Sequence, residues 1–313
     1  MNNLKKILPL LILILFISII FFYFRKNESD FLVIRHLDSF LLIKIIILCF
    51  LYLLTEGLIL KNIVTLLGKK IHFFQSFLVM NATYFCNTFI QFSGLGYRVY
   101  YLKKFQNIKI SEILRFSIDT IVCEILTFSL MGIISISFID CYSNEVNINN
   151  TLYLVFLIFF FSSLIYLKFL GKIILRIKIL LNKLNITLFD KIIETFLIQK
   201  SNHISFYKKQ FLVFIMQYIL LFLIFFLILK KIDTENFTFL SLLITSLVDF
   251  SFLIALTPFS VGISEFVTFM GTRDTPLSFA EIIIVINVFK ICMLLIYFIC
   301  GPIFILINLR KMN

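Results

Sequence analysis

The chain has 313 residues, of which 61% are hydrophobic and 15% are charged, and its mean hydropathy is +1.05. Soluble domains are about half apolar and about a quarter charged, so this composition excludes a soluble enzyme, a disordered protein and a secreted disulfide scaffold. The net charge of +12 indicates cytoplasmic loops beside anionic lipid headgroups, and no nucleic acid partner.

Apolar runs long enough to cross a bilayer need about 20 residues. They lie at about 7–24, 39–60, 113–139, 151–170, 211–229, 237–257 and 281–308. The first run follows two lysines and lacks a small-residue cleavage site, so we expect a membrane anchor and not a signal peptide. The last run has 28 residues, about 42 Å of helix, and must tilt, kink near Pro302 or begin among the headgroups.

Two further apolar segments are interrupted by residues that break helices. Residues 73–97 carry Asn, Gln and two glycines, and residues 257–271 carry Pro258 and Gly262. Non-helical backbone at membrane depth is tolerated only where protein or a watery cavity satisfies it. We therefore expect both segments to be broken or re-entrant helices.

The charges of the loops test this expectation. Residues 61–72 carry a net charge of +3, residues 98–115 of +4, residues 140–150 of −2 and residues 168–210 of +7. Positive loops remain in the cytoplasm. A re-entrant 73–97 segment puts all three positive loops on that side, whereas a full crossing would separate the first two. The N-terminus is then cytoplasmic, and the membrane we expect is the plasma membrane.

These elements predict an all-α, polytopic integral membrane protein with about 7–8 transmembrane helices. We expect one transmembrane domain over residues 1–313, with halves of about 1–150 and 151–313 and no soluble domain. The polar stretch 171–210 is basic and amphipathic, which fits either an interfacial helix on the cytoplasmic leaflet or a plain connector.

An internal repeat is indicated by a shift of 167 residues. This shift places Phe92 and Ser93 on Phe259 and Ser260, so that the two interrupted segments superpose. Two short broken segments in corresponding halves are the pattern of a transporter built from inverted repeats. The alternative is a chance match in a sequence of low complexity.

The interrupted segments also resemble those of a known family. The first carries Asn87, Gly94, Gly96, Arg98 and Tyr101; the second carries Pro258, Gly262 and Glu265; the last apolar run carries Lys290. They are similar to the membrane region of lysylphosphatidylglycerol synthases and of stand-alone flippase-like proteins of the UPF0104 group. The resemblance covers nearly the whole chain.

Two departures from the family pattern concern the breaks. A proline that often precedes the first glycine break is absent, and the second break has one glycine where many members have more. No stretch resembles the cytoplasmic aminoacyl-transferase domain of the bifunctional members. What the resemblance implies is movement of a lipid between leaflets without lipid synthesis.

Charged residues inside apolar runs are costly, so each is a candidate functional residue. Arg98 could bind a lipid phosphate, because a guanidinium matches phosphate bidentately, and Glu265 could bind an amine of the same headgroup. The alternatives are a structural ion pair between these two residues, or an Arg98 that reaches the interface. Lys290 needs a carboxylate partner, for which we expect Glu265 or Asp249.

Glu124 and Asp249 have no partner nearby in the sequence and could serve a proton- or ion-coupled mechanism. Glu56 is near the end of its run, so we expect it to reach the interface, and Gln217 we expect to join helices by hydrogen bonds. The predicted substrate-binding residues are Asn87, Gly94, Gly96, Arg98, Tyr101, Glu124, Asp249, Pro258, Gly262, Glu265 and Lys290.

Three functions remain open at this point. The first is a lipid translocase, the second a membrane-embedded transferase, and the third a non-transporting partner of a separate lipid synthase or glycosyltransferase. The motifs HxxxxD, DxD, GxSxG and the phosphate-binding loop are all absent, so we expect no enzyme. The six Cys form no CxxC pair and the three His are far apart, so we expect no metal and no cofactor.

Overall fold

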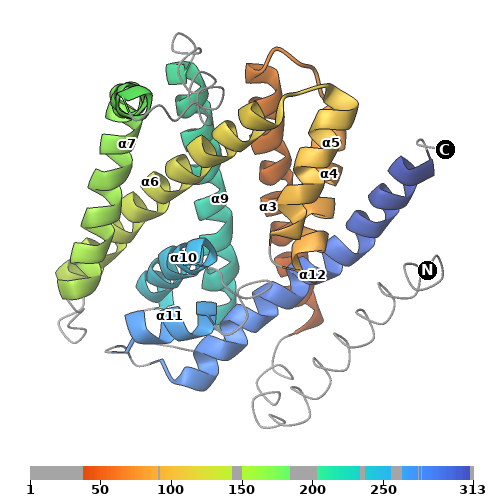
Figure 1. The fold of residues 1–313 in the computed structure, drawn as a ribbon. Coiled ribbons are helices and arrows are strands. Elements are labelled where there is room, and N and C mark those ends of the chain that lie inside the picture. The colour runs from red at the N-terminus through yellow and green to blue at the C-terminus, as the bar shows by residue number, and fades with distance from the viewer. Residues whose placement is uncertain are drawn as a thin grey trace.

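The computed structural model describes residues 38–90, 92–142, 150–183, 203–232, 237–254, 263–273, 275 and 277–310. All regular structure in these ranges is helical (Figure 1). The helices are α3 (Ser39–Leu66), α4 (Phe73–Asn87), α5 (Ser93–Gln106), α6 (Ile110–Tyr142), α7 (Asn150–Lys183), α9 (His203–Ile232), α10 (Phe237–Ile254), α11 (Ile263–Gly271) and α12 (Phe279–Arg310). The predicted anchor at 7–24 lies outside the described residues.

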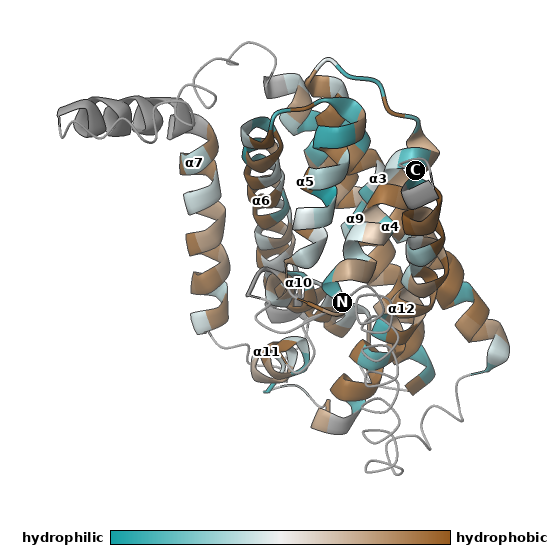
Figure 2. Ribbon diagram, turned by 45° about the vertical axis from the view of Figure 1, so that its right-hand side comes forward, coloured by the Kyte–Doolittle hydropathy of each residue, from teal (hydrophilic) through white to brown (hydrophobic). Residues whose placement is uncertain are grey.

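Four of these helices are long and apolar enough to cross a membrane. They are α3, α6, α9 and α12, which correspond to the predicted runs 39–60, 113–139, 211–229 and 281–308. Large apolar side chains remain exposed along them, for example Ile47, Leu212 and Ile299. Figure 2 shows the same helices as predominantly hydrophobic. An apolar surface of this extent is expected where lipid is the solvent, so the prediction of a polytopic membrane protein is confirmed.

Helices α4 and α5 form a hairpin that turns back inside the bundle. They contain 15 and 14 residues, about 22 Å and 21 Å, and each is shorter than the roughly 30 Å thickness of a bilayer core. Gln75 near the start of α4 donates a hydrogen bond to the hydroxyl of Tyr101 near the end of α5. Both ends of the segment therefore lie together, as a re-entrant element requires.

The order of long and short helices repeats in the second half. Adding 167 to the bounds of α3, α4, α5 and α6 gives 206–233, 240–254, 260–273 and 277–309, all within three residues of α9, α10, α11 and α12. The packing repeats as well: α4 contacts α3, α5 and α12, and α10 contacts α9, α11 and α6. From the sequence, 237–257 is predicted to be a membrane span. In the repeat, however, α10 corresponds to α4, which is the first helix of a hairpin.

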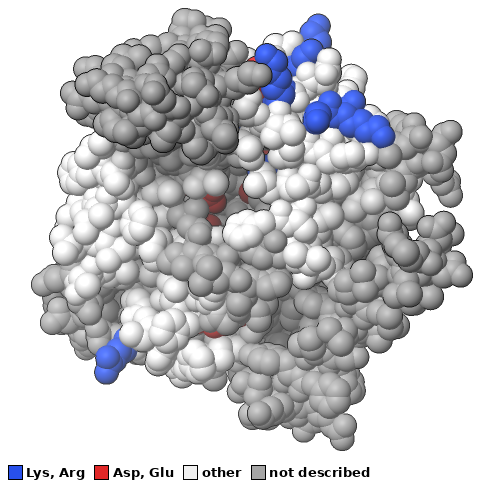
Figure 3. Space-filling view, viewed as in Figure 1, with Lys and Arg blue, Asp and Glu red and all other residues white. Residues whose placement is uncertain are grey.

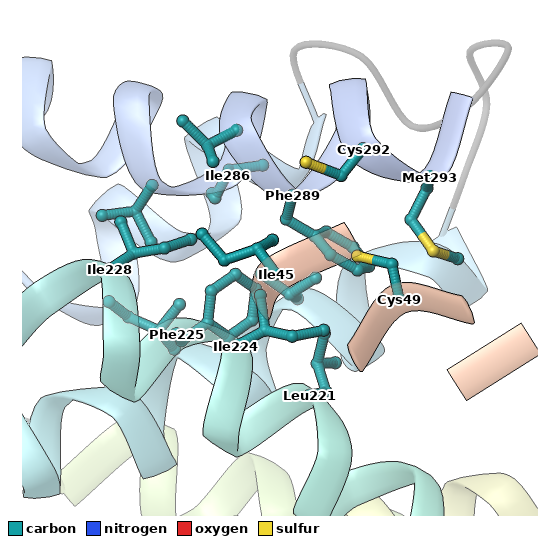
Figure 4. Packing of buried hydrophobic residues seen from close by; sticks show 14 of the residues in the cluster. Ile45, Cys49, Leu221, Ile224, Phe225, Ile228, Ile286, Phe289, Cys292 and Met293 are labelled. Atoms are coloured by element: carbon teal, nitrogen blue, oxygen red, sulfur yellow. The ribbon is translucent and has the colours of Figure 1, made fainter. Parts of the chain in front are cut away.

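The two equivalent helices at the centre run in opposite directions. Gln210 of α9 donates to the carbonyl oxygen of Ile59, and Gln217, further along α9, donates to Glu56, which is earlier in α3. Figure 4 shows how side chains of α3, α9 and α12 interdigitate in the main hydrophobic cluster. An antiparallel pairing of α3 and α9 is the arrangement expected of inverted repeats.

Helices α7 and α12 agree with the elements predicted from the sequence, apart from two details. Helix α7 begins at Asn150 and continues to Lys183, so the predicted amphipathic stretch 171–210 is helical in its first part, and residues 184–202 lie outside the described ranges. Helix α12 contains Pro302 in a continuous helix of 32 residues, and it crosses the bundle at a steep tilt (Figure 1).

Candidate functional site

A small cavity lies between α3, α6, α9 and α10. Its volume of about 10 Å³ is room for roughly one water molecule. Phe128 and Phe214 contribute apolar side chains to its lining. Its polar lining consists of Tyr52, Glu124, Thr127, Gln217, Tyr218 and Asp249. Figure 3 shows acidic side chains at the bottom of a hollow in this face of the molecule.

Glu124 and Asp249 come from two different helices and meet at this cavity. Glu124 is in the middle of α6 and Asp249 is near the end of α10, and these helices pack against each other. The charge of Asp249 acts on Glu124, and the charge of a third carboxylate, Glu56, acts on both. The prediction left both residues without partners, and the structure brings them together.

Glu56 corrects a prediction made from the sequence. Its side chain is only 7% exposed, so it does not reach the interface. Its Oε1 accepts a hydrogen bond from Nε2 of Gln217 at 2.9 Å. Its carboxylate also accepts a hydrogen bond from the hydroxyl of Tyr84 on α4. The apolar run ends at about residue 60, but α3 continues to Leu66, which places Glu56 about 15 Å from the end of the helix.

Arg98 lies on α5, and its guanidinium points to the same interior. Its Nη2 donates to Ser117 at 3.2 Å, its Nη1 lies 4.0 Å from the sulfur of Met80, and its buried Nε has no hydrogen-bond partner among the described residues. The charge of Glu56 also acts on it. Guanidinium groups have five N–H donors, so Arg98 retains donors for an anionic ligand.

Asn87 and Gly94 build the turn that holds Arg98. Oδ1 of Asn87 accepts a hydrogen bond from the backbone N–H of Gly94 at 2.7 Å. A Cβ at Gly94 would lie 2.0 Å from the carbonyl oxygen of Thr83, so only glycine fits there. A Cβ at Gly96 would meet nothing within 4 Å. These residues, with Tyr101 at the hairpin ends, hold the re-entrant element together.

Glu265 and Lys290 form a second buried charge group. Nζ of Lys290 lies 2.9 Å from Oε1 of Glu265, with 3% and 9% of the side chains exposed, and Ser264 donates to Oε2. Of the two partners predicted for Lys290, the structure selects Glu265. Under the shift of 167 residues, Glu265 is the counterpart of Arg98. In each half, the charged side chain after the break contacts the next long helix: Arg98 contacts Ser117 of α6, and Glu265 contacts Lys290 of α12.

The predicted site therefore divides into two charge groups. One joins Arg98, Glu56, Glu124 and Asp249, and the other joins Glu265 and Lys290. The predicted Pro258 and Gly262 lie outside the described residues. The sequence missed Glu56, Tyr52 and Tyr84, because each lies in an apolar run and acquires its role only from helix packing. Within the described ranges, no cluster of three His, Cys, Asp or Glu side chains could hold a metal ion.

Long apolar helices packed around charged side chains define a polytopic membrane protein. The family model of the lysylphosphatidylglycerol synthase TM region matches residues 6–301, and the chain belongs to this family. The family resemblance inferred from the sequence is thus confirmed, and it associates the chain with membrane lipid metabolism or transport. No curated protein and no solved structure matches the chain.

Proposed function

We propose that this protein moves a phospholipid or an isoprenoid-linked lipid between the leaflets of the plasma membrane. The observation that carries the proposal is the group formed by Arg98, Glu56, Glu124 and Asp249 inside a bundle of long apolar helices, with Glu56 buried and the other three half-buried. Charges at membrane depth are costly, and they are retained where they line a path for a polar substrate. A lipid headgroup is the polar substrate that the family suggests.

Arg98 is the group that would bind the phosphate. Its free Nε and its remaining Nη donors suit two oxygens of one phosphate, and α5, which begins five residues earlier at Ser93, adds the positive partial charge of its N-terminus. The cavity in its present form accommodates about one water molecule, so passage of a headgroup requires the helices around it to separate.

In this proposal the protein acts without catalysing a covalent reaction, with its N-terminus in the cytoplasm. Its partners are the lipid substrate and the bilayer. Two alternatives are a membrane-embedded transferase and a non-transporting partner of a separate lipid synthase or glycosyltransferase. The transferase would need a nucleophile or general base beside a donor site.

Reconstitution in liposomes tests the proposal. Fluorescent lipids with different headgroups are placed in both leaflets, and a quencher that cannot cross the membrane is added outside. A translocase makes fluorescence of inner-leaflet lipid accessible at a rate above that of protein-free liposomes, for at least one lipid class. Rates equal to protein-free liposomes for every phospholipid and isoprenoid-linked lipid would contradict the proposal and favour the partner hypothesis.

A further inference from the structure

The lining of the cavity consists of hydrogen-bond acceptors more than donors. Glu124 and Asp249 contribute carboxylates, and neither receives a hydrogen bond from any residue that the structure describes. Gln217, which is 5% exposed, uses its Nε2 for Glu56, so its Oε1 is the atom left for the cavity. Thr127 uses its hydroxyl proton for the carbonyl oxygen of Cys123. A cation or a hydrogen-bond donor is the occupant that these acceptors favour.

The size of the cavity restricts that occupant further. About 10 Å³ suffices for a water-sized particle and not for the ammonium group of a lipid with its attached chain. Among the described residues, no group of three His, Cys, Asp or Glu side chains is placed to hold a metal ion. Two carboxylates and an amide oxygen around such a volume suit a small monovalent cation.

The charges around the cavity also favour a cation as its occupant. Glu124 on α6 faces Asp249 on α10 and Glu56 on α3, and Arg98 on α5 acts on Glu56. The other titratable groups facing these carboxylates are phenols: Tyr52 on α3, Tyr84 on α4, Tyr218 on α9 and Tyr297 on α12. Three carboxylates, with Glu56 buried and Glu124 and Asp249 half-buried, thus surround one guanidinium, and an uncompensated charge in a low-dielectric interior is strongly unfavourable.

We propose that Glu124 and Asp249 bind one small monovalent cation, a proton or a sodium ion, in this cavity and that its binding and release are coupled to lipid movement. The coupling rests on the proposed function, whereas the binding does not. The cation neutralises the group while the helices are closed. Its departure leaves two carboxylates to repel each other across the α6–α10 interface, which favours the separation that a headgroup needs.

Binding is tested first, on the full chain purified in detergent. Infrared difference spectra are recorded between alkaline and acidic buffer, and between sodium and potassium at constant pH. We expect a carboxyl signal that responds to acid if the cation is a proton, or to sodium if it is sodium. The signal should be lost or halved in Asp249→Asn and in Glu124→Gln. It should persist in Asp38→Asn, a control whose exposed side chain makes no capping hydrogen bond at the start of α3.

Two results would overturn the proposal: no response to either cation, or a response that both variants retain. Size-exclusion profiles and thermal unfolding of the variants serve as a folding check. Because each variant removes one of three repelling carboxylates, its stability should equal or exceed that of the wild type. A variant that unfolds is replaced by Asp249→Glu, which should keep the signal and shift its midpoint.

Coupling is tested in liposomes with a proton gradient, a sodium gradient or neither. A potential of about 100 mV acting on one coupled charge can bias the lipid distribution by up to roughly fiftyfold. Lipid movement that ignores both gradients overturns the coupling. Absence of lipid movement in every arm, with the infrared signal present, contradicts the proposed function and leaves the cation site intact.

Discussion

Helix α4 packs on α12 and helix α10 packs on α6, and these two interfaces occupy equivalent places in the repeat. The first is filled: Tyr84 stacks on Tyr297 with ring centroids 5.2 Å apart, and Phe85 meets Phe298 edge to face. The second surrounds the cavity with its carboxylates.

The shift of 167 residues shows where the two interfaces diverged. Asp249 corresponds to Ala82, and Glu124 corresponds to Ile291. One architecture thus supports a packed interface in one place and a polar cavity in the other. We infer that α4–α12 is the rigid side of the molecule and α6–α10 the side that opens.

The largest effect should come from breaking the buried ion pair of the second half. Glu265→Ala leaves the ammonium of Lys290 buried without its carboxylate, which should lower the free energy of unfolding by about 3–5 kcal/mol. The double variant Glu265→Ala, Lys290→Met should recover most of this loss. Chemical unfolding in detergent measures both. A single variant as stable as the wild type would contradict a stabilising role for this ion pair.

The next largest effect should distinguish the two glycines of the first break, Gly94 and Gly96. Gly94→Ala forces a Cβ against backbone and should destabilise the protein by about 2–3 kcal/mol. Gly96→Ala has open space and should change stability by at most about 0.5 kcal/mol. Thermal unfolding of the pair separates them, and equal midpoints would show that the hairpin is packed differently.

A smaller effect should distinguish the packed interface from the cavity. A Cβ at Gly301 would lie 2.5 Å from Cβ of Phe85, so Gly301→Ala should destabilise α4–α12 by about 1–2 kcal/mol. Glu124→Gln at α6–α10 should cause no loss. The two variants are compared by unfolding in the same detergent. A loss at Glu124 that matches the loss at Gly301 would contradict the assignment of rigid and opening sides.

The inversion of the two halves can be examined with almost no perturbation. In a background without native cysteines, single cysteines replace exposed residues at the ends of the hairpins. A cysteine at Lys70 or Lys103 should react with an impermeant reagent from the cytoplasmic side, and a cysteine at Arg273 from the outside. Labelling of all three from one side would leave the helices repeated but not inverted.

The sequence predicted the spans and the breaks because apolar length and glycine position are local properties. The four long runs became α3, α6, α9 and α12, and the first break became a hairpin. The prediction that Glu56 reaches the interface was wrong, because the apolar run ends before the helix does. Helix length beyond an apolar run is not visible in composition.

Grouping of the charges could be predicted only in part. A lysine inside an apolar run needs a carboxylate partner, and few carboxylates lie in the apolar runs. The sequence could therefore restrict the partner of Lys290 to Glu265 or Asp249. The meeting of Glu124 with Asp249 depends on how α6 crosses α10, and the approach of Glu56 to Arg98 depends on how α3 and α5 pack in the bundle. Neither arrangement has a sequence signal within one helix.

The central claim is that lipid passes through the interior beside Arg98. Its most direct test compares Arg98→Ala with Lys103→Ala, an exposed basic residue one and a half turns along the same helix, in the liposome assay. The account predicts that Arg98→Ala abolishes lipid movement while the protein remains folded, that Arg98→Lys restores it in part because a point charge loses the bidentate geometry, and that Lys103→Ala moves lipid at the wild-type rate. Wild-type lipid movement by the folded Arg98→Ala protein would contradict it.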